Sequence, residues 1–124
     1  MTYEEFNNFC GSFAATSYVM QWGNAHVWKV GGKVFAIGGW EKAEGPGITF
    51  KTSELNFEFL THKDYYRPAP YLASRGMKWI QQFGASSALD EELKYYISES
   101  YRIVSLGLSK KKQKELGLNV DAKH

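Results

Sequence analysis

The histidines, the cysteine and the serines are the side chains of this 124-residue chain that could do metal or nucleophilic chemistry. His26, His62 and His124 lie far apart and form no H-x-x-x-H or H-E-x-x-H pair, which would place two imidazoles on one helix face. Cys10 is the only cysteine, so neither an intramolecular disulfide nor a thiolate zinc site can form. No serine lies in a G-x-S-x-G elbow. We therefore expect a non-catalytic protein with no metal and no cofactor.

Glycine-rich stretches and loop carboxylates do not change that expectation. The pairs Gly31-Gly32 and Gly38-Gly39 lack the Lys-Ser/Thr pair and the following helix of a phosphate-binding loop. Glu41 and Glu44 lie in a polar loop, with no second carboxylate forced near them. These segments predict turns rather than chemistry.

Basic residues beside aromatic rings form the remaining pattern that could bind a ligand. Cationic side chains neutralise phosphates, and flat rings can stack on bases. The candidate phosphate-binding residues are Lys29, Lys33, Lys51, Arg75, Lys78, Lys110, Lys111 and Lys112. The alternative ligand site is an aromatic cleft of Trp22, Trp28, Tyr71 and Trp79.

A structural explanation exists for the same residues. Trp28 and Trp79 also suit the core of a sheet, and the lysine run also suits the solvated end of a helix, where cations complement the helix dipole. The net charge of +2 is too small to indicate nucleic acid by itself. Both explanations therefore stay open at the level of sequence.

Local patterns in the first half predict one helix and a run of strands. The capping box Thr2-x-x-Glu5 and apolar residues at helical spacing predict a helix over residues 3–14. Residues 16–22 and 48–51 are typical of strands, and Gly31-Gly32 predicts a hairpin with a two-residue turn.

The hairpin turn also predicts a register. Val30 would lie opposite Lys33, Trp28 opposite Phe35 and His26 opposite Ile37. One face of the ribbon would then be bulky and apolar, while Lys29 and Val34 would share the other.

Patterns in the second half predict two helices and one more strand. Ser53 is a plausible N-cap of a short helix, and its inward-facing residues would be Leu55, Phe59 and Leu60. Pro68 and Pro70 exclude a helix interior, and residues 77–83 predict a last strand. The longest helix would open at Ser87 and Asp90 and run toward Leu108, with an acidic first turn and a basic end.

This order of elements predicts the fold class. Glycine turns between strands favour an antiparallel sheet, so we expect a single α+β domain over residues 1–118 with helices packed on one sheet face. Residues 119–124 would form a frayed tail. No run approaches the roughly 20 apolar residues of a membrane span, and no signal-peptide pattern opens the chain, so we expect a cytoplasmic protein.

The order and spacing of several segments resemble the MmcQ/YjbR family of small bacterial proteins. The segments are Gln21-Trp22-Gly23, Val27 to Ala36, Ile48-Thr49-Phe50-Lys51, Pro68 to Leu72 with Arg75 and Lys78-Trp79-Ile80, and Leu89 through Tyr101 to Lys112. The resemblance implies a CyaY-like α+β fold. It also implies DNA binding, through the "double-wing" arrangement that the family shares with a phage transcription factor domain.

A fold likeness to frataxin-type proteins would instead imply iron binding through an acidic first helix. That helix offers only Glu4 and Glu5 here, too few hard oxygen ligands for a metal site. Our leading hypothesis is therefore a non-catalytic protein that binds DNA weakly, without sequence preference, through backbone phosphates. The alternative is a small-molecule or protein interaction module that uses the aromatic cleft and has no nucleic-acid role.

Overall fold

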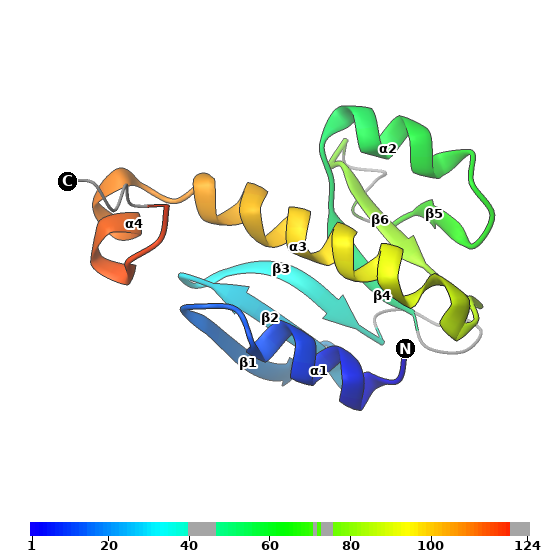
Figure 1. Cartoon of the computed structure of the whole chain (residues 1–124), viewed down its shortest axis with the longest axis horizontal. Coiled ribbons are helices and arrows are strands. Elements are labelled where there is room, and N and C mark those ends of the chain that lie inside the picture. The colour runs from blue at the N-terminus through cyan, green and yellow to red at the C-terminus, as the bar shows by residue number, and fades with distance from the viewer. Residues whose placement is uncertain (40–46, 71, 73–75, 120–124) are drawn as a thin grey trace.

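Six strands form one antiparallel sheet in the order β1-β2-β3-β4-β6-β5. The structure, a computed structural model, describes residues 1–39, 47–70, 72 and 76–119. The strands are β1 (Thr16–Gln21), β2 (Ala25–Val30), β3 (Lys33–Gly38), β4 (Ile48–Lys51), β5 (Tyr66–Pro68) and β6 (Trp79–Gln82). The helices are α1 (Tyr3–Gly11), α2 (Glu54–Thr61), α3 (Asp90–Leu106) and α4 (Lys110–Leu116), with a 3-10 turn at Ser87–Leu89. Figure 1 shows this arrangement.

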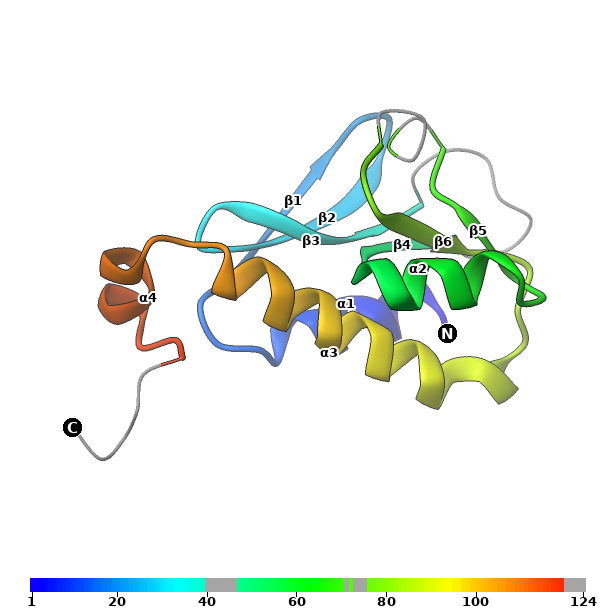
Figure 2. The same cartoon turned by 90° about the horizontal axis from the view of Figure 1, so that it is seen from above.

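Helices α1, α2 and α3 lie against one face of the sheet, which confirms the predicted α+β class (Figure 2). Between them and the sheet lies the main core, where Phe6, Phe35 and Ile97 are fully buried. A smaller apolar cluster covers the opposite sheet face and includes Val27 and Trp79. The sheet is therefore buried on both faces at its centre.

A β-bulge at Phe35 changes the predicted hairpin register. Val30 lies opposite Lys33 as expected, but Trp28 lies opposite Ala36 and His26 opposite Gly38. The predicted pairs of Trp28 with Phe35 and of His26 with Ile37 are therefore wrong. An extra residue in one strand shifts every later pair by one position. Ile37 consequently packs in the smaller cluster, on the face away from the helices.

The hydroxyl of Ser100 on α3 completes the hydrogen bonding at this bulge. The next β3–β4 pair beyond Ala36 and Phe50 would join Phe35 to Lys51, but the ladder stops before it. Ser100 Oγ instead donates to the Phe35 carbonyl at 2.6 Å and accepts from the Lys51 amide at 2.9 Å. The hydroxyl of a fully buried serine thus takes the place of one backbone pair between β3 and β4.

The first helix is confirmed with its capping box, but it ends at Gly11 rather than at residue 14. The Ser12 hydroxyl donates to the Phe9 carbonyl at 2.6 Å, and Ala15 adopts a left-handed φ of 60°, so the chain turns here toward β1. Phe13, beyond the helix, stacks on Tyr101 of α3 with ring centroids 4.5 Å apart.

In α2 the predicted N-cap Ser53 is confirmed, but the predicted inward face is wrong for two of its three residues. Leu55 and Phe59 are 80% and 57% exposed. Phe57 and Leu60, spaced i and i+3, share the buried side, whereas Leu55 and Phe59, spaced i and i+4, share the opposite side. Because the two pairs lie on opposite sides of α2, packing the helix against the sheet buries only one of them.

The second half contains one strand that the sequence did not predict. β5 is short and lies at the sheet edge, the place where a strand tolerates a proline such as Pro68. β6 confirms the last predicted strand but covers only residues 79–82 of the expected 77–83.

The lysine run does not form the end of the long helix. α3 ends at Leu106, and Ser109 then caps a separate helix, α4, through a hydrogen bond from the Lys112 amide to Ser109 Oγ at 3.1 Å. Lys110, Lys111 and Lys112 therefore occupy a helix N-terminal turn, where cations oppose the helix dipole. The prediction that these lysines lie at the C-terminal end of a helix, where they would complement the helix dipole, is therefore wrong.

The chain after α4 returns to the fold. Leu118 is 5% exposed and belongs to the main core. The Asn119 amide donates to Gln113 Oε1 at 3.0 Å and to Ser105 Oγ at 3.3 Å. Of the tail expected at residues 119–124, only Asn119 lies within the described residues.

Candidate nucleic-acid interface

The tip of the β2–β3 hairpin packs against the loop before α4 and against α4 itself. A methyl group on Gly31 would lie 2.6 Å from Leu108 Cδ1 and 3.1 Å from Leu116 Cδ1, so a side chain at this position would force the two leucine side chains to move. Gly31 also has a φ of +57°, which the hairpin turn requires. The hairpin tip and α4 consequently share one end of the molecule (Figure 1).

Six lysines gather at this end, which we call the basic end. They are Lys29, Lys33, Lys110, Lys111, Lys112 and Lys114. Lys33 begins β3 next to the turn, and Lys29 lies opposite Val34, one pair further along the hairpin. Lys33 and the α4 lysines are exposed, and none of the six forms an ion pair with an acid in the described part of the chain.

Hydrogen bonds from Gln113 fix α4 in place. This side chain is 4% exposed, and its amide donates to the carbonyls of Leu108 at 2.8 Å and Leu106 at 3.3 Å. Because those carbonyls belong to the end of α3 and the loop that follows it, α4 is anchored to α3. The cluster of lysines is therefore held on a defined surface.

Acidic residues gather at the other end of α3. The N-terminal amine bonds Asp90 Oδ1 at 2.8 Å, which brings the first turns of α1 and α3 together. The acids of these two turns are Glu4, Glu5, Asp90, Glu91 and Glu92. With 17 residues, α3 separates them from the basic end by about 25 Å. Three of these acids pair with cations at the same end, since the N-terminal amine, Lys94 and Lys63 lie within ion-pair distance of Asp90, Glu91 and Glu92.

The structure places Lys51 and Lys78 apart from the basic end, beside each other and α2. Lys51 lies opposite Trp79, and the Thr52 amide donates to the Lys78 carbonyl at 2.9 Å. The Lys78 ammonium lies 4.8 Å from the centre of the Phe57 ring, a cation–π distance. Arg75, predicted in the same group, lies outside the described residues.

The structure does not bring the predicted aromatic cleft together. Trp28 packs on the helix side of the sheet, whereas Trp79 belongs to the cluster on the opposite face. Trp22 lies in the turn after β1 and is 53% exposed. Tyr71 lies outside the described residues.

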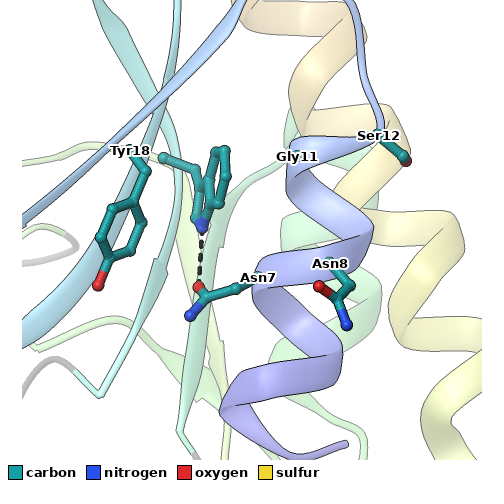
Figure 3. Close-up of a pocket in the computed structure, with 6 residues that line it drawn as sticks. Asn7, Asn8, Gly11, Ser12 and Tyr18 are labelled. Carbon is teal, nitrogen blue, oxygen red and sulfur yellow. Dashed lines mark hydrogen bonds between the residues drawn. The ribbon is translucent and has the colours of Figure 1, made fainter.

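A different hollow lies beside Trp28, and we call it the Trp28 groove. It has a volume of about 630 Å³ between α1 and the β1–β2 edge (Figure 3). The lining residues are Asn7, Asn8, Gly11, Ser12, Tyr18 and Trp28. Sequence reasoning selected only Trp28. The other members form a small polar stripe on α1 at positions i, i+1, i+4 and i+5, and a tyrosine directly opposite Trp28.

Hydrogen bonds hold the aromatic side of this groove. Trp28 Nε1 donates to Asn7 Oδ1 at 2.9 Å, and Tyr18 Oη lies 2.9 Å from His26 Nδ1. Figure 3 shows Asn7 pointing from α1 toward the sheet. Gly11 lies against the indole, since a methyl group there would approach Trp28 to 3.0 Å. The Trp28 ring is therefore fixed by its neighbours.

The shifted pKa values belong to structural groups away from both surfaces. Burial raises the pKa of the Cys10 thiol far above its ordinary range. Burial also raises the pKa of Glu92, but hydrogen bonds from Lys63 at 2.8 Å and Tyr66 at 2.6 Å outweigh it and leave that pKa below its usual value. Within the described residues, no three His, Cys, Asp or Glu side chains gather so as to hold a metal ion. No helix in residues 1–39, 47–70, 72 or 76–119 has the length and apolar character needed to cross a bilayer.

Comparison with known proteins identifies the kind of domain. The family model described as YjbR matches residues 11–103, which is more than half of the chain. The fold is similar to the crystal structure of Deinococcus radiodurans protein DR2400, which has a DUF419 domain. The TM-score is 0.81 with 20% sequence identity, and the match covers 99% of this chain and 94% of the other. No curated protein matches the sequence.

Proposed function

We propose that this chain, which belongs to the YjbR family, is a non-catalytic DNA-binding protein that contacts backbone phosphates through its basic end. The observation that carries the proposal is the packing of the hairpin tip against Leu108 and Leu116, because it joins lysines far apart in sequence into one exposed cluster. The proposed location is the bacterial cytoplasm, where such a protein would meet DNA.

The chemistry of the cluster supports phosphate contact without sequence readout. An ammonium group is a point charge that attracts phosphate oxygens but carries no fixed pattern of donors for base edges. Lysines without acidic partners lose no ion pair when they bind an anion. Affinity on the order of micromolar and a steep dependence on salt are typical of such contacts.

The test is fluorescence anisotropy of a labelled mixed-sequence duplex at two salt concentrations. We expect binding at low salt that collapses at high salt. The double variant Lys33→Glu, Lys110→Glu should bind about a hundredfold more weakly at 50 mM salt, because each phosphate contact is worth about tenfold there. The matched control Lys51→Glu, Lys78→Glu makes the same change in net charge away from the basic end, and it should lose far less.

A small-molecule or protein site in the Trp28 groove is the second candidate, and the hollow beside Trp28 favours it. The salt titration separates the two functions. No duplex binding at low salt, or equal losses in both double variants, would reject the basic end as a DNA site.

A further inference from the structure

We infer that the preferred nucleic acid is single-stranded and that one unpaired base stacks in the Trp28 groove. This inference rests on the proposed function and adds to it the form of nucleic acid and a second contact site. The groove would then hold the base, and the basic end would contact the phosphate backbone.

The groove opens close to the basic end. Thr16 at the start of β1 lies opposite Val30, next to the hairpin turn, and the Gly31 amide donates to the Ala15 carbonyl at 3.4 Å. The Tyr18–Trp28 pair lies two residues further along the same strands, or about 7 Å. A strand whose phosphates lie on the hairpin tip and α4 can therefore reach the groove with its next one or two nucleotides.

The groove suits a neutral, flat group. Its six lining residues are all uncharged at neutral pH, so it holds no cation that would attract a phosphate. The Tyr18 side chain is 43% exposed, and its ring lies 5.3 Å from the Trp28 ring at an angle of 54°. Two tilted rings leave an open aromatic surface rather than a closed stack. A base is the part of a nucleic acid that matches this surface.

Polar groups on α1 complement the edge of a base. Asn8 is exposed. Its side-chain amide, which can both donate and accept, makes no hydrogen bond to any described side chain or backbone group. The Ser12 hydroxyl donates a hydrogen bond to the Phe9 carbonyl, and its oxygen can still accept one from the ligand. Asn7 Oδ1 accepts the hydrogen bond from Trp28 Nε1, so Asn7 positions the indole ring instead of contacting a ligand.

A duplex cannot use this site without losing a base pair. The groove lies between α1 and the β1–β2 edge, so a base must leave its helical stack to enter. Stacking on an aromatic side chain is worth about 1–3 kcal/mol per base, which corresponds to roughly 5- to 150-fold in affinity. We expect a preference of about tenfold for a single strand.

The experiment compares three probes of equal length at low salt: a single-stranded oligonucleotide, its duplex, and a single strand made of abasic residues. The base-containing single strand should bind about tenfold more tightly than either of the others. Tyr18→Ala should remove that advantage and leave duplex and abasic binding unchanged. Tyr95→Ala is the matched control, because Tyr95 is 57% exposed on α3 and lies outside the groove.

A spectroscopic measurement covers the case in which Tyr18→Ala destabilises β1. Binding of the base-containing strand should quench tryptophan fluorescence in the unaltered protein, and Trp28→Phe should abolish most of that quenching. Equal affinities for the base-containing and abasic strands, or quenching that survives Trp28→Phe, would overturn the base site. If the basic end contacts phosphates, the double variant Lys33→Glu, Lys110→Glu would still lower the affinity for every probe. Failure of all three probes to bind would reject the proposed function itself.

Discussion

Replacing Lys111 and Lys112 by glutamate should make the protein more stable and a weaker DNA binder at the same time. Both residues lie in the first turn of α4, where cations oppose the helix dipole and carboxylates complement it. The glutamate at position 112 would also complete a capping box with Ser109, whose hydroxyl already accepts from the residue 112 amide. The two charge reversals together should stabilise α4 by about 1.4 kcal/mol.

Amide hydrogen exchange measures that gain directly. A gain of about 1.4 kcal/mol in the stability of α4 slows exchange through local opening of residues 113–118 about tenfold. In the DNA titration, the loss of two phosphate contacts lowers affinity about a hundredfold at 50 mM salt and makes the slope of log K against log salt shallower by about 2. Loss of binding therefore cannot be ascribed to unfolding.

Lys114→Glu is the control inside the same helix. Lys114 lies in the last turn, where a cation suits the dipole, so its reversal should speed exchange while also weakening binding. If Lys111→Glu, Lys112→Glu speeds exchange, the reasoning from the helix dipole fails. If the salt slope stays unchanged, these two lysines do not contact phosphate.

Three further results are expected. Ser100→Ala should destabilise the fold by about 3 kcal/mol in urea unfolding, because it leaves the Phe35 carbonyl and the Lys51 amide unpaired in the core; a loss below 1 kcal/mol would mean that the serine bridge is dispensable. Glu92 has a folded pKa below its unfolded value, so the stability it contributes is present above about pH 4.5 and is lost as pH falls through the folded pKa. Glu92→Gln should therefore reduce the difference in unfolding free energy between pH 7 and pH 3, and an unchanged difference would contradict that assignment. The Cys10 thiol should react with a thiol reagent only after unfolding, since burial raises its pKa and covers it; rapid labelling of the native protein would refute this.

Local patterns in the sequence predicted most of the elements correctly. The Thr2 capping box and the Gly31-Gly32 turn each depend on interactions within a few residues, and the structure confirms both. The bulge at Phe35 was not predictable in the same way. The Phe35 carbonyl at this bulge bonds to Ser100, 65 residues away in the sequence, at the point where the β3–β4 ladder has ended.

The candidate site was predictable only in part, for a similar reason. A run of lysines is visible in sequence, but its place at the start of a helix depends on the break at Gly107 between α3 and α4. Its contact with the hairpin tip depends on tertiary packing at Gly31. The Trp28 groove combines α1 with β1 and β2, and no single segment of the chain contains enough of it to indicate a pocket.

The two edge strands of the sheet, β1 and β5, differ in their tendency to pair with a strand of another copy of the protein. β5 is three residues long, carries Arg67 and ends in Pro68, which are features that discourage pairing with another strand. β1 is six residues long, contains neither charge nor proline, and leaves Tyr18 and Met20 about half exposed. Concentrated protein should therefore self-associate by edge-to-edge pairing of β1. One charge at the exposed position opposite Lys29, such as Ser17→Glu, should keep it monodisperse in light scattering without altering the rest of the fold.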